Sequence, residues 1–86
     1  MDVNFKPTFV KKFKNLDADL QEEILEKIEL FKDTNNHQQL KVHKRSGPLK
    51  DRYSFSVNYK TRVVFEYISK KEVVLLAIGD HNVYKN

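Results

Sequence analysis

The side chains best suited to chemistry in this sequence are basic, and they are concentrated in one stretch. Between residues 40 and 62 seven Lys and Arg residues stand against a single acid, Asp51. The seven are Lys41, Lys44, Arg45, Lys50, Arg52, Lys60 and Arg62. Strands rich in Tyr and Phe begin within this stretch and continue beyond it. A concentrated cationic surface beside aromatic strands is typical of proteins that hold a polyanion, and nucleic acid is the partner that we expect first.

The division of charge along the chain is more informative than its total. The formal net charge is only +4, but residues 41–62 sum to +6 and residues 17–33 to −5. A simpler interpretation remains open, because long Lys and Arg side chains also solvate one face of an ordinary sheet. Composition alone does not separate a ligand surface from a solvated face.

Metal and nucleotide chemistry are not favoured by the sequence. The three histidines, His37, His43 and His81, lack the spacing of metal ligands, and the chain has no cysteine. With two glycines there is no Gly-rich phosphate loop. We therefore expect no cofactor and no metal, and we expect His37 to be an exposed loop residue without a role.

Length and composition predict one small domain over residues 1–86, with 40% hydrophobic residues available for a core. The absence of cysteine suits a reducing compartment. The longest apolar run, at 73–78, is too short to span a bilayer, so we expect a cytoplasmic protein without a membrane partner.

Apolar residues at helical spacing predict two helices. The first begins at Pro7, which is tolerated in a first turn, and ends by Asn15 or Asp17. Its apolar positions are Phe9, Val10, Phe13 and Leu16. The second takes Asp17 as its N-cap and ends at the polar run 33–37. Its apolar stripe is Leu20, Ile24, Leu25, Ile28 and Phe31.

Four strands are predicted. A short strand at 2–6 before Pro7 suits a sheet edge. The alternation of Tyr53, Phe55, Val57 and Tyr59 with polar residues predicts a strand with one buried face. Runs at 61–68 and 72–78 predict a hairpin, and the second, apolar from Val73 to Ile78, predicts a central strand. The strand aromatics, which we expect in the core, are Tyr53, Phe55, Tyr59, Phe65 and Tyr67.

This order of elements predicts an α+β fold, in which an N-terminal strand and a helical hairpin pack on a mostly antiparallel four-stranded sheet. The helices cover one face, and the other face is expected to be concave or open. The pattern leaves open which face carries Arg62, because the register across the turn at 58–61 is not fixed by it.

Two stretches, HKRSGPLKDRYSFSVNYKTRVVFEY and EVVLLAIGDHNVY, together resemble the RelE/ParE superfamily of type II toxin–antitoxin toxins. The resemblance covers nearly the whole chain. It rests on the turn near Gly47, the strand that leads into Arg62 and Val63-Val64-Phe65, the apolar strand, and the closing Gly79-x-His81-x-x-Tyr84. The C-terminal pair of His81 and Tyr84 is most similar to the RelE and YafQ branch, whose members cut messenger RNA in the ribosomal A site.

The resemblance implies site residues. It places Arg62 at the strand arginine of the family, His81 at a tail position often held by a catalytic His or Arg, and Tyr84 at the tail aromatic. His43 and Lys50 match, less closely, a histidine before the Gly turn and a lysine of the basic stretch. Ser56 departs from the pattern, because many relatives carry an arginine or histidine at this position of the middle strand.

The implied reaction is metal-free RNA cleavage, in which the ribose 2′-OH attacks the adjacent phosphate. Arg62 and Lys50 would stabilise the phosphate charge. His81 would transfer a proton with His43 as its counterpart, and Tyr84 would stack on or orient a base. The expected contacts to the RNA backbone come from Lys41, Lys44, Arg45, Arg52 and Lys60. The implied partners are a cognate antitoxin, the ribosome and messenger RNA.

Other interpretations stay open at this point. The ParE side of the superfamily implies a non-catalytic inhibitor of DNA gyrase, and the departure at Ser56 allows an inactive relative that binds an antitoxin or RNA without cutting. Tyr84 is equally suited to closing the core. Arg62 is equally suited to an ion pair with Glu66 or Asp80.

Overall fold

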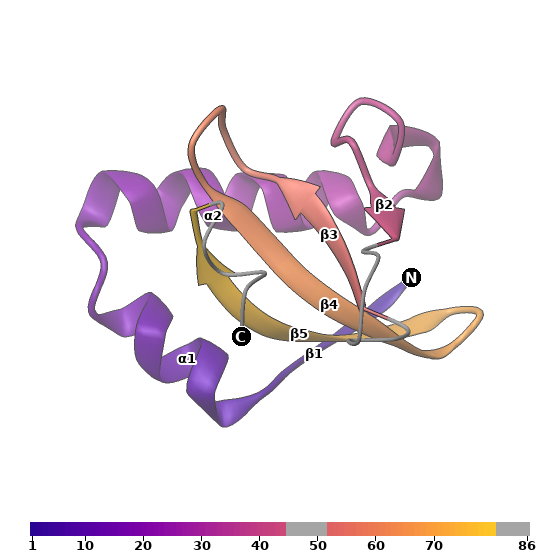
Figure 1. The fold of residues 1–86 in the computed structure, drawn as a ribbon, viewed down its shortest axis with the longest axis horizontal. Helices are drawn as coiled ribbons and strands as arrows, with labels where there is room; N and C mark the ends of the chain where they lie inside the picture. The colour runs from indigo at the N-terminus through magenta and orange to yellow at the C-terminus, as the bar shows by residue number, and fades with distance from the viewer. Residues whose placement is uncertain (45–51, 81–86) are drawn as a thin grey trace.

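A computed structural model describes residues 1–44 and 52–80 of the 86-residue chain. Two helices and a short 3₁₀ turn precede most of the strands (Figure 1). The elements are β1 (Asp2–Phe5), α1 (Pro7–Lys14), α2 (Ala18–Phe31), η1 (Thr34–Asn36), β2 (His43–Lys44), β3 (Arg52–Ser56), β4 (Arg62–Ser69) and β5 (Glu72–Gly79). None of the helices in this part of the chain is long and apolar enough to span a membrane.

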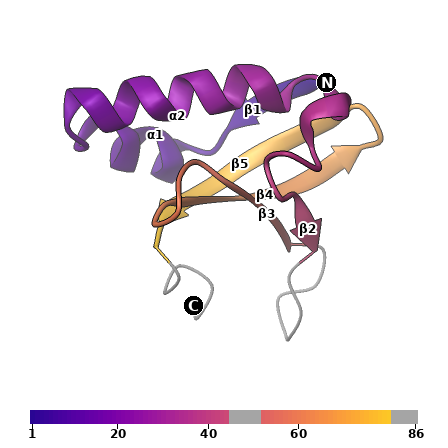
Figure 2. The same cartoon turned by 90° about the horizontal axis from the view of Figure 1, so that it is seen from above.

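The strands form one sheet in the order β1-β5-β4-β3-β2. The pair β1–β5 is parallel and the other three pairs are antiparallel. Both helices lie on the same face of the sheet (Figure 2). This confirms the predicted α+β fold, with the N-terminal strand at an edge and the apolar last strand in the interior of the sheet. The structure adds a fifth strand, β2, whose two residues fall in a connector for which no strand was predicted.

Local signals in the sequence explain the two helices. Pro7 lies in the first turn of α1, where its missing N–H has no partner to lose. Asp17 caps α2, because its carboxylate accepts a hydrogen bond from the Leu20 N–H at 2.8 Å. The Gln21 side chain then donates to the Phe13 carbonyl at 2.9 Å, which holds the two helices together.

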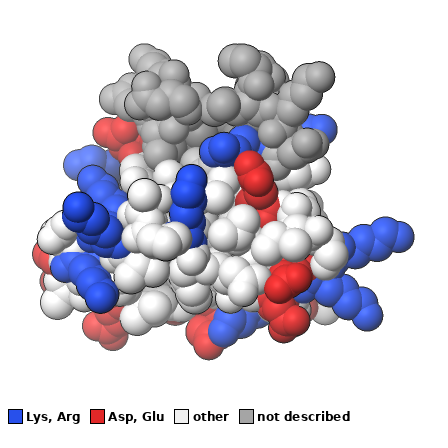
Figure 3. Space-filling view, turned by 90° about the horizontal axis from the view of Figure 1, so that it is seen from below, with Lys and Arg blue, Asp and Glu red and all other residues white. Residues whose placement is uncertain are grey.

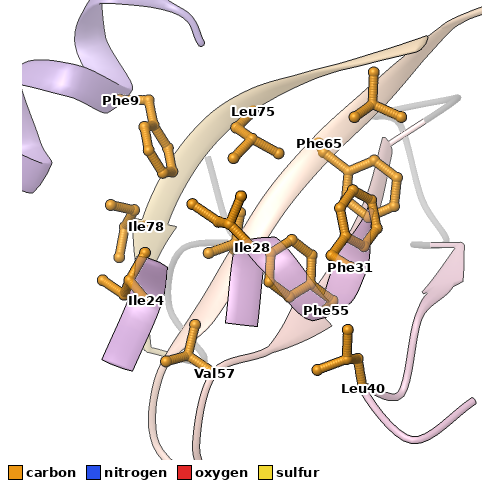
Figure 4. Packing of buried hydrophobic residues seen from close by; sticks show 12 residues of the cluster. Phe9, Ile24, Ile28, Phe31, Leu40, Phe55, Val57, Phe65, Leu75 and Ile78 are labelled. Atoms are coloured by element: carbon orange, nitrogen blue, oxygen red, sulfur yellow. The ribbon is translucent and has the colours of Figure 1, made fainter. Parts of the chain in front are cut away.

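Three phenylalanines form the centre of the core (Figure 4). Phe31, from the last turn of α2, stacks on Phe55 of β3 at a ring separation of 4.6 Å. It meets Phe65 of β4 edge-on at 4.8 Å. All three side chains are fully buried. The same cluster includes Phe9, Ile24, Ile28, Leu40, Val57, Val63, Val73, Leu75 and Ile78.

His37 is a structural residue, so the expectation of an exposed loop histidine is wrong. Its ring stacks on Phe31 at 4.7 Å, and its Nε2–H donates to the Phe31 carbonyl at 2.8 Å. The last carbonyls of a helix have no partner within the helix. His37 supplies one at the end of α2, and the contact draws its ring against the core.

The prediction that Tyr59 and Tyr67 lie in the core is wrong. The strand predicted over 53–59 ends at Ser56, because the Asn58 side-chain oxygen accepts the N–H groups of Lys60 and Thr61 and closes a turn. Tyr59 therefore lies at the tip of this turn, 90% exposed. Tyr67 is 38% exposed and packs edge-on against Tyr53. Tyr53 is half-buried against the core.

The Phe31 cluster gives a stability prediction. We expect Phe31→Ala to lower the free energy of unfolding by about 3–5 kcal/mol, because it opens a cavity among rings that cannot collapse into it. Leu25→Ala, on the exposed side of the same helix, is the matched control and should cost less than about 1 kcal/mol. Urea denaturation of the two variants measures both effects. Equal losses would show that the Phe31 contacts do not dominate the core.

The Tyr53–Tyr67 pair gives a pH prediction. Burial raises the pKa of the Tyr67 hydroxyl above its ordinary value of 10.0, and the neighbouring Tyr53 adds to the shift. The unfolded chain therefore loses this proton first, so the free energy of unfolding falls as the pH rises through the tyrosine range. Denaturation from about pH 8 to about pH 11 should show a steeper loss in the wild type than in Tyr67→Phe. Parallel curves would contradict this.

Candidate functional site

Pairing across the sheet places the polar residues on the face that lies opposite the helices. Directly paired residues share a face. Phe55, Val63 and Phe65 face the helices, so the residues that alternate with them face away. One row on this outer face consists of Ser56, Arg62 and Gly79. The next row consists of His43, Ser54, Val64 and Ala77. The register that the sequence left open thus puts Arg62, Ser56 and His43 on one face.

The centre of this outer face, which was expected to be concave or open, carries buried side chains. Ser54 is fully buried and Val64 is 6% exposed. The Ser54 hydroxyl has no hydrogen-bond partner among the described residues. Ser56 and Arg62, at the end of the sheet, are partly exposed. The accessible polar groups of this face therefore surround its centre, with Ser56 and Arg62 at one end, His43 on β2, and Arg52 with Glu66 at the other end.

Arg62 is held by the backbone of the turn before it. Its Nη1 donates to the carbonyl oxygens of Asn58, at 2.8 Å, and Thr61, at 3.3 Å. Its other guanidinium nitrogens have no hydrogen bond to the described residues. The ion pair with Glu66 that we considered for Arg62 is made by Arg52 instead, at 2.6 Å.

Asn58 organises this end of the sheet. Its side-chain oxygen closes the turn, its carbonyl receives the Arg62 guanidinium, and its amide nitrogen donates to Glu23 of α2 at 2.7 Å. The turn that orients Arg62 is thereby attached to the helical layer. A side chain fixed in this way loses little entropy when it binds an anion.

A hollow of about 260 Å³ lies beside Arg62, between the end of β3 and the segment that follows η1. We call it the cationic hollow, because Lys27, Lys41 and Arg62 line it and no acid is found among its described lining residues. The other lining residues are Gln39, Leu40, Ser56, Val57, Asn58 and Tyr59. The Ser56 N–H donates to the Leu40 carbonyl at 2.8 Å, which joins the two walls.

A hydrogen bond joins the ring of His43 to the backbone of Lys41. The Nδ1–H of His43 donates to the Lys41 carbonyl at 2.8 Å. This hydrogen bond fixes the tautomer, so that in the neutral ring Nε2 is the nitrogen without a proton. Lys41 has a φ of 58°, in the left-handed region, which costs a non-glycine residue roughly 1–2 kcal/mol. The contact with His43 and the turn hydrogen bonds around Lys41 offset part of this cost.

The other predicted RNA contacts within the described residues lie at different places on the structure. Arg52 is engaged with Glu66, and Lys44 is exposed on β2, opposite Tyr53. Lys60 is exposed and borders a groove along α2 rather than the cationic hollow. This groove is acidic, with Asp17, Asp19, Glu22, Glu23 and Glu26 in its wall. Of the predicted RNA contacts within the described residues, Lys41 is the one that lines the same hollow as Arg62.

Four predicted site residues, Arg45, Lys50, His81 and Tyr84, lie outside the described residues. Their assignments remain predictions. Gly79 pairs directly with Arg62, so the chain segment that leads to His81 and Tyr84 leaves the sheet next to this arginine. Among the described residues, no three His, Asp or Glu side chains are grouped so that they could hold a metal ion.

Sequence reasoning missed Asn58 and Lys27. Asn58 stands directly after an apolar strand residue and before an exposed turn, a position where Asn commonly closes a turn with its own backbone. That signal was present. Lys27 stands among the acids of α2, and only the packing of α2 on the sheet brings it near Arg62.

Positive charge also gathers at a second place. Lys6 and the α1 residues Lys11, Lys12 and Lys14 are exposed, and α1 contains no acid. Figure 3 views the molecule from below and shows Lys and Arg side chains grouped on the left, over α1, with others projecting on the right from the β4–β5 hairpin. The cationic surface thus extends beyond residues 41–62.

No protein-family model matches the sequence, and no curated protein matches it significantly. Solved structures are similar to it. A chain of the archaeal RelE–RelB complex from Pyrococcus horikoshii is 18% identical with a TM-score of 0.70, and 92% of each chain is covered. A chain of the heterotetrameric YoeB–YefM toxin–antitoxin complex from Staphylococcus aureus is 18% identical with a TM-score of 0.72, covering 94% of this chain and 97% of the other.

A third similar chain comes from the intact E. coli RelBE toxin–antitoxin complex. It is 16% identical with a TM-score of 0.68, and the alignment covers 92% of this chain and 94% of that chain. All three alignments span nearly the full length of both chains. The chain therefore has the fold of these RelE and YoeB chains, which is the fold that the resemblance of its sequence implied.

Proposed function

We propose that this protein is the toxin of a type II toxin–antitoxin system and acts in the cytoplasm as a ribosome-dependent endoribonuclease. The observation that carries the proposal is Arg62, an arginine oriented by two backbone carbonyls on the outer face of a RelE-like sheet. It lies where the tail that carries His81 and Tyr84 leaves the sheet. A preorganised cation at such a place suits the charge of a reacting phosphate.

The reaction needs three groups. A base removes the proton of the ribose 2′-OH, and the resulting oxygen attacks the adjacent phosphorus. The bond to the 5′-oxygen of the next nucleotide breaks, which leaves a 2′,3′-cyclic phosphate, and an acid gives that oxygen a proton. Arg62 stabilises the negative charge that develops on the phosphate oxygens. The proton transfers fall to His81 and His43, and Tyr84 orients a base.

The tautomer of His43 supports its role as the base. Because Nδ1–H donates to the Lys41 carbonyl, Nε2 is the nitrogen that can accept a proton. His43 and Arg62 share the outer face but lie two strand spacings of about 4.8 Å apart. A single phosphodiester does not bridge them without help in positioning. This separation favours a reaction that takes place only when the RNA is held in place by the ribosome.

The distribution of charge supports the same setting. Lysines of α1 lie on the helical layer, whereas Lys41 and Arg62 lie near the end of the sheet. Cations on separate sides suit a protein that is surrounded by ribosomal RNA, because each phosphate contact adds to the affinity. A protein that binds one strand along one face would need only the cations of residues 41–62 and not the lysines of α1.

We further propose that an antitoxin covers the apolar groove between α1 and α2. The groove, of about 200 Å³, is lined by Phe5, Phe9, Val10, Phe13, Leu25 and Ile28. Phe5 and Leu25 are 45% and 52% exposed. Lysines of α1 lie beside the groove, so an amphipathic helix with acidic flanks complements it in both polarity and charge. The similar chains from P. horikoshii, S. aureus and E. coli come from toxin–antitoxin complexes.

Leu25→Glu tests the antitoxin surface. We expect it to abolish neutralisation by the protein that a neighbouring small reading frame encodes, because it places a charge in an apolar groove, while the toxicity of the chain itself is unchanged. Growth on co-expression and co-purification measure the effect. Lys32→Gln, at the exposed end of the same helix, changes the net charge by the same one unit and is the control. If co-expression with Leu25→Glu still restores growth, the groove is not the antitoxin site.

Arg62→Gln tests the nuclease. In a reconstituted translation system with a codon held in the A site, we expect cleavage to slow by about 10²-fold or more, because the phosphate loses its principal cation. Lys70→Gln removes the same charge at the far end of the sheet and should cleave like the wild type. His81→Ala should also abolish cleavage. Cleavage at the wild-type rate by Arg62→Gln and His81→Ala would refute the assignment.

A further inference from the structure

The cationic hollow beside Arg62 has a composition that the proposed chemistry does not require. Lys27 comes from α2, Lys41 from the segment after η1 and Arg62 from β4, so three distant parts of the chain each contribute one cation. Like charges brought together repel one another unless a counter-charge is near. None of the described residues that line the hollow is an acid.

The partners of these three cations are few. Lys27 has one carboxylate contact, to Glu26 at 3.8 Å, which is long and lies on the exposed side of the helix. The Lys41 ammonium has no partner among the described residues. The Nη1 of Arg62 donates to two carbonyl oxygens, and its other guanidinium nitrogens have no hydrogen bond to the described residues. Among the described residues these three cations thus have no close ion pair, and Glu23, the acid beside the hollow, is bound to the Asn58 amide at 2.7 Å.

The hollow also presents neutral hydrogen-bonding groups. Ser56, Gln39 and Asn58 line it beside the cations. A hydroxyl and an amide are typical additional ligands of phosphate oxygens. Its volume of about 260 Å³ lies below the range of about 300–1,000 Å³ for sites that enclose a whole drug-sized ligand. It suits one charged group rather than a complete nucleobase and sugar.

We propose that the cationic hollow binds one phosphate of a single-stranded RNA backbone, at a position next to the phosphate that Arg62 stabilises. Lys27 and Lys41 are the residues that hold it, and they position the strand rather than react with it. On this face β3 carries Arg52, which is paired with Glu66, and the neutral Ser54 and Ser56. The positive charge at the hollow is therefore supplied by α2, by the segment after η1 and by Arg62 of β4. This inference rests on the proposed function for the identity of RNA as the ligand.

The backbone at Lys41 favours this interpretation. The residue adopts a positive φ although it is not glycine, and residues held in such conformations are concentrated at ligand sites. The left-handed conformation directs the chain from η1 past the end of β3, where the Leu40 carbonyl receives the Ser56 N–H. Lys41 is thereby brought to the wall opposite Arg62.

Binding of a 2′-O-methyl oligoribonucleotide, which cannot be cleaved, tests the proposal by fluorescence anisotropy at several salt concentrations. The variants are Lys27→Gln, Lys41→Asn and the double variant. Asn tolerates a positive φ, so it removes the charge and keeps the turn. Lys70→Gln is the control for the net charge of the single variants, and thermal melts confirm that each variant is folded. Lys41→Arg, which keeps the positive charge that Lys41→Asn removes, should bind like the wild type.

We expect the double variant to bind at least tenfold more weakly than the variant Lys70→Gln/Lys71→Gln, which removes the same two charges from the exposed β4–β5 turn. The slope of log K against log salt should fall by about 0.7, the value for one phosphate contact on a single strand. An oligomer of the same sequence with uncharged methylphosphonate linkages should bind the wild type and the double variant equally. Inorganic phosphate should compete only weakly if the site takes a phosphodiester within a chain. Tight competition would instead assign the hollow to a free phosphate and overturn the RNA proposal.

The outcome separates this proposal from the nuclease. If the wild type does not cleave but the double variant loses binding, the nuclease fails and the phosphate site stands. If the wild type cleaves and the double variant binds like Lys70→Gln/Lys71→Gln, the phosphate site fails alone.

Discussion

The burial of Phe31 between Phe55 and Phe65 determines where every polar group of the sheet lies. Side chains of a strand alternate between two faces, so once Phe55 and Phe65 turn toward α2, their neighbours must turn away from it. Ser56 and Arg62 then share the outer face, directly opposite each other. A shift of one residue in register would bury Arg62 under the helices. The position of the candidate site is thus a consequence of core packing.

Asn58 connects this packing to the chemistry. The strands β3 and β4 could be joined by many turns, but the one formed here directs the carbonyls of Asn58 and Thr61 at the Arg62 guanidinium. The hydrogen bond from Asn58 to Glu23 attaches the turn to α2. The helical layer therefore contributes to the site twice, because Lys27 of the same helix lines the hollow beside Arg62. A binding site on a surface turn gains rigidity from such attachment.

Much of the fold could be predicted from the sequence, because its signals are local. Pro7, the Asp17 cap and the apolar stripe to Phe31 define the helices, and the run from Val73 to Ile78 identifies the interior strand. Tyr59 was misplaced because alternation continues past the point where the Asn58 side chain closes the turn. His37 was misjudged because its partner, the Phe31 carbonyl, depends on how the chain turns after the helix.

The candidate site was less predictable. The basic stretch was evident, and the resemblance to the RelE/ParE superfamily singled out Arg62 and His43. The sequence did not show that Lys41 and Lys60 lie at different sites. Tertiary packing alone places Lys41 beside Arg62 and Lys60 beside the acids of α2. Lys27 carries no signal of its own, being one cation among the acids of an amphipathic helix. Charge in a sequence predicts that a polyanion binds, whereas the packing of helices on the sheet determines where.

Mapping RNA 5′ ends across the transcriptome after induction in cells tests whether this chain cuts messenger RNA as it is translated, as we propose. We expect new ends within coding regions, in phase with the reading frame, that disappear when translation initiation is blocked. Growth arrest with intact transcripts and trapped gyrase–DNA complexes would contradict the proposal and assign the fold here to inhibition of DNA gyrase.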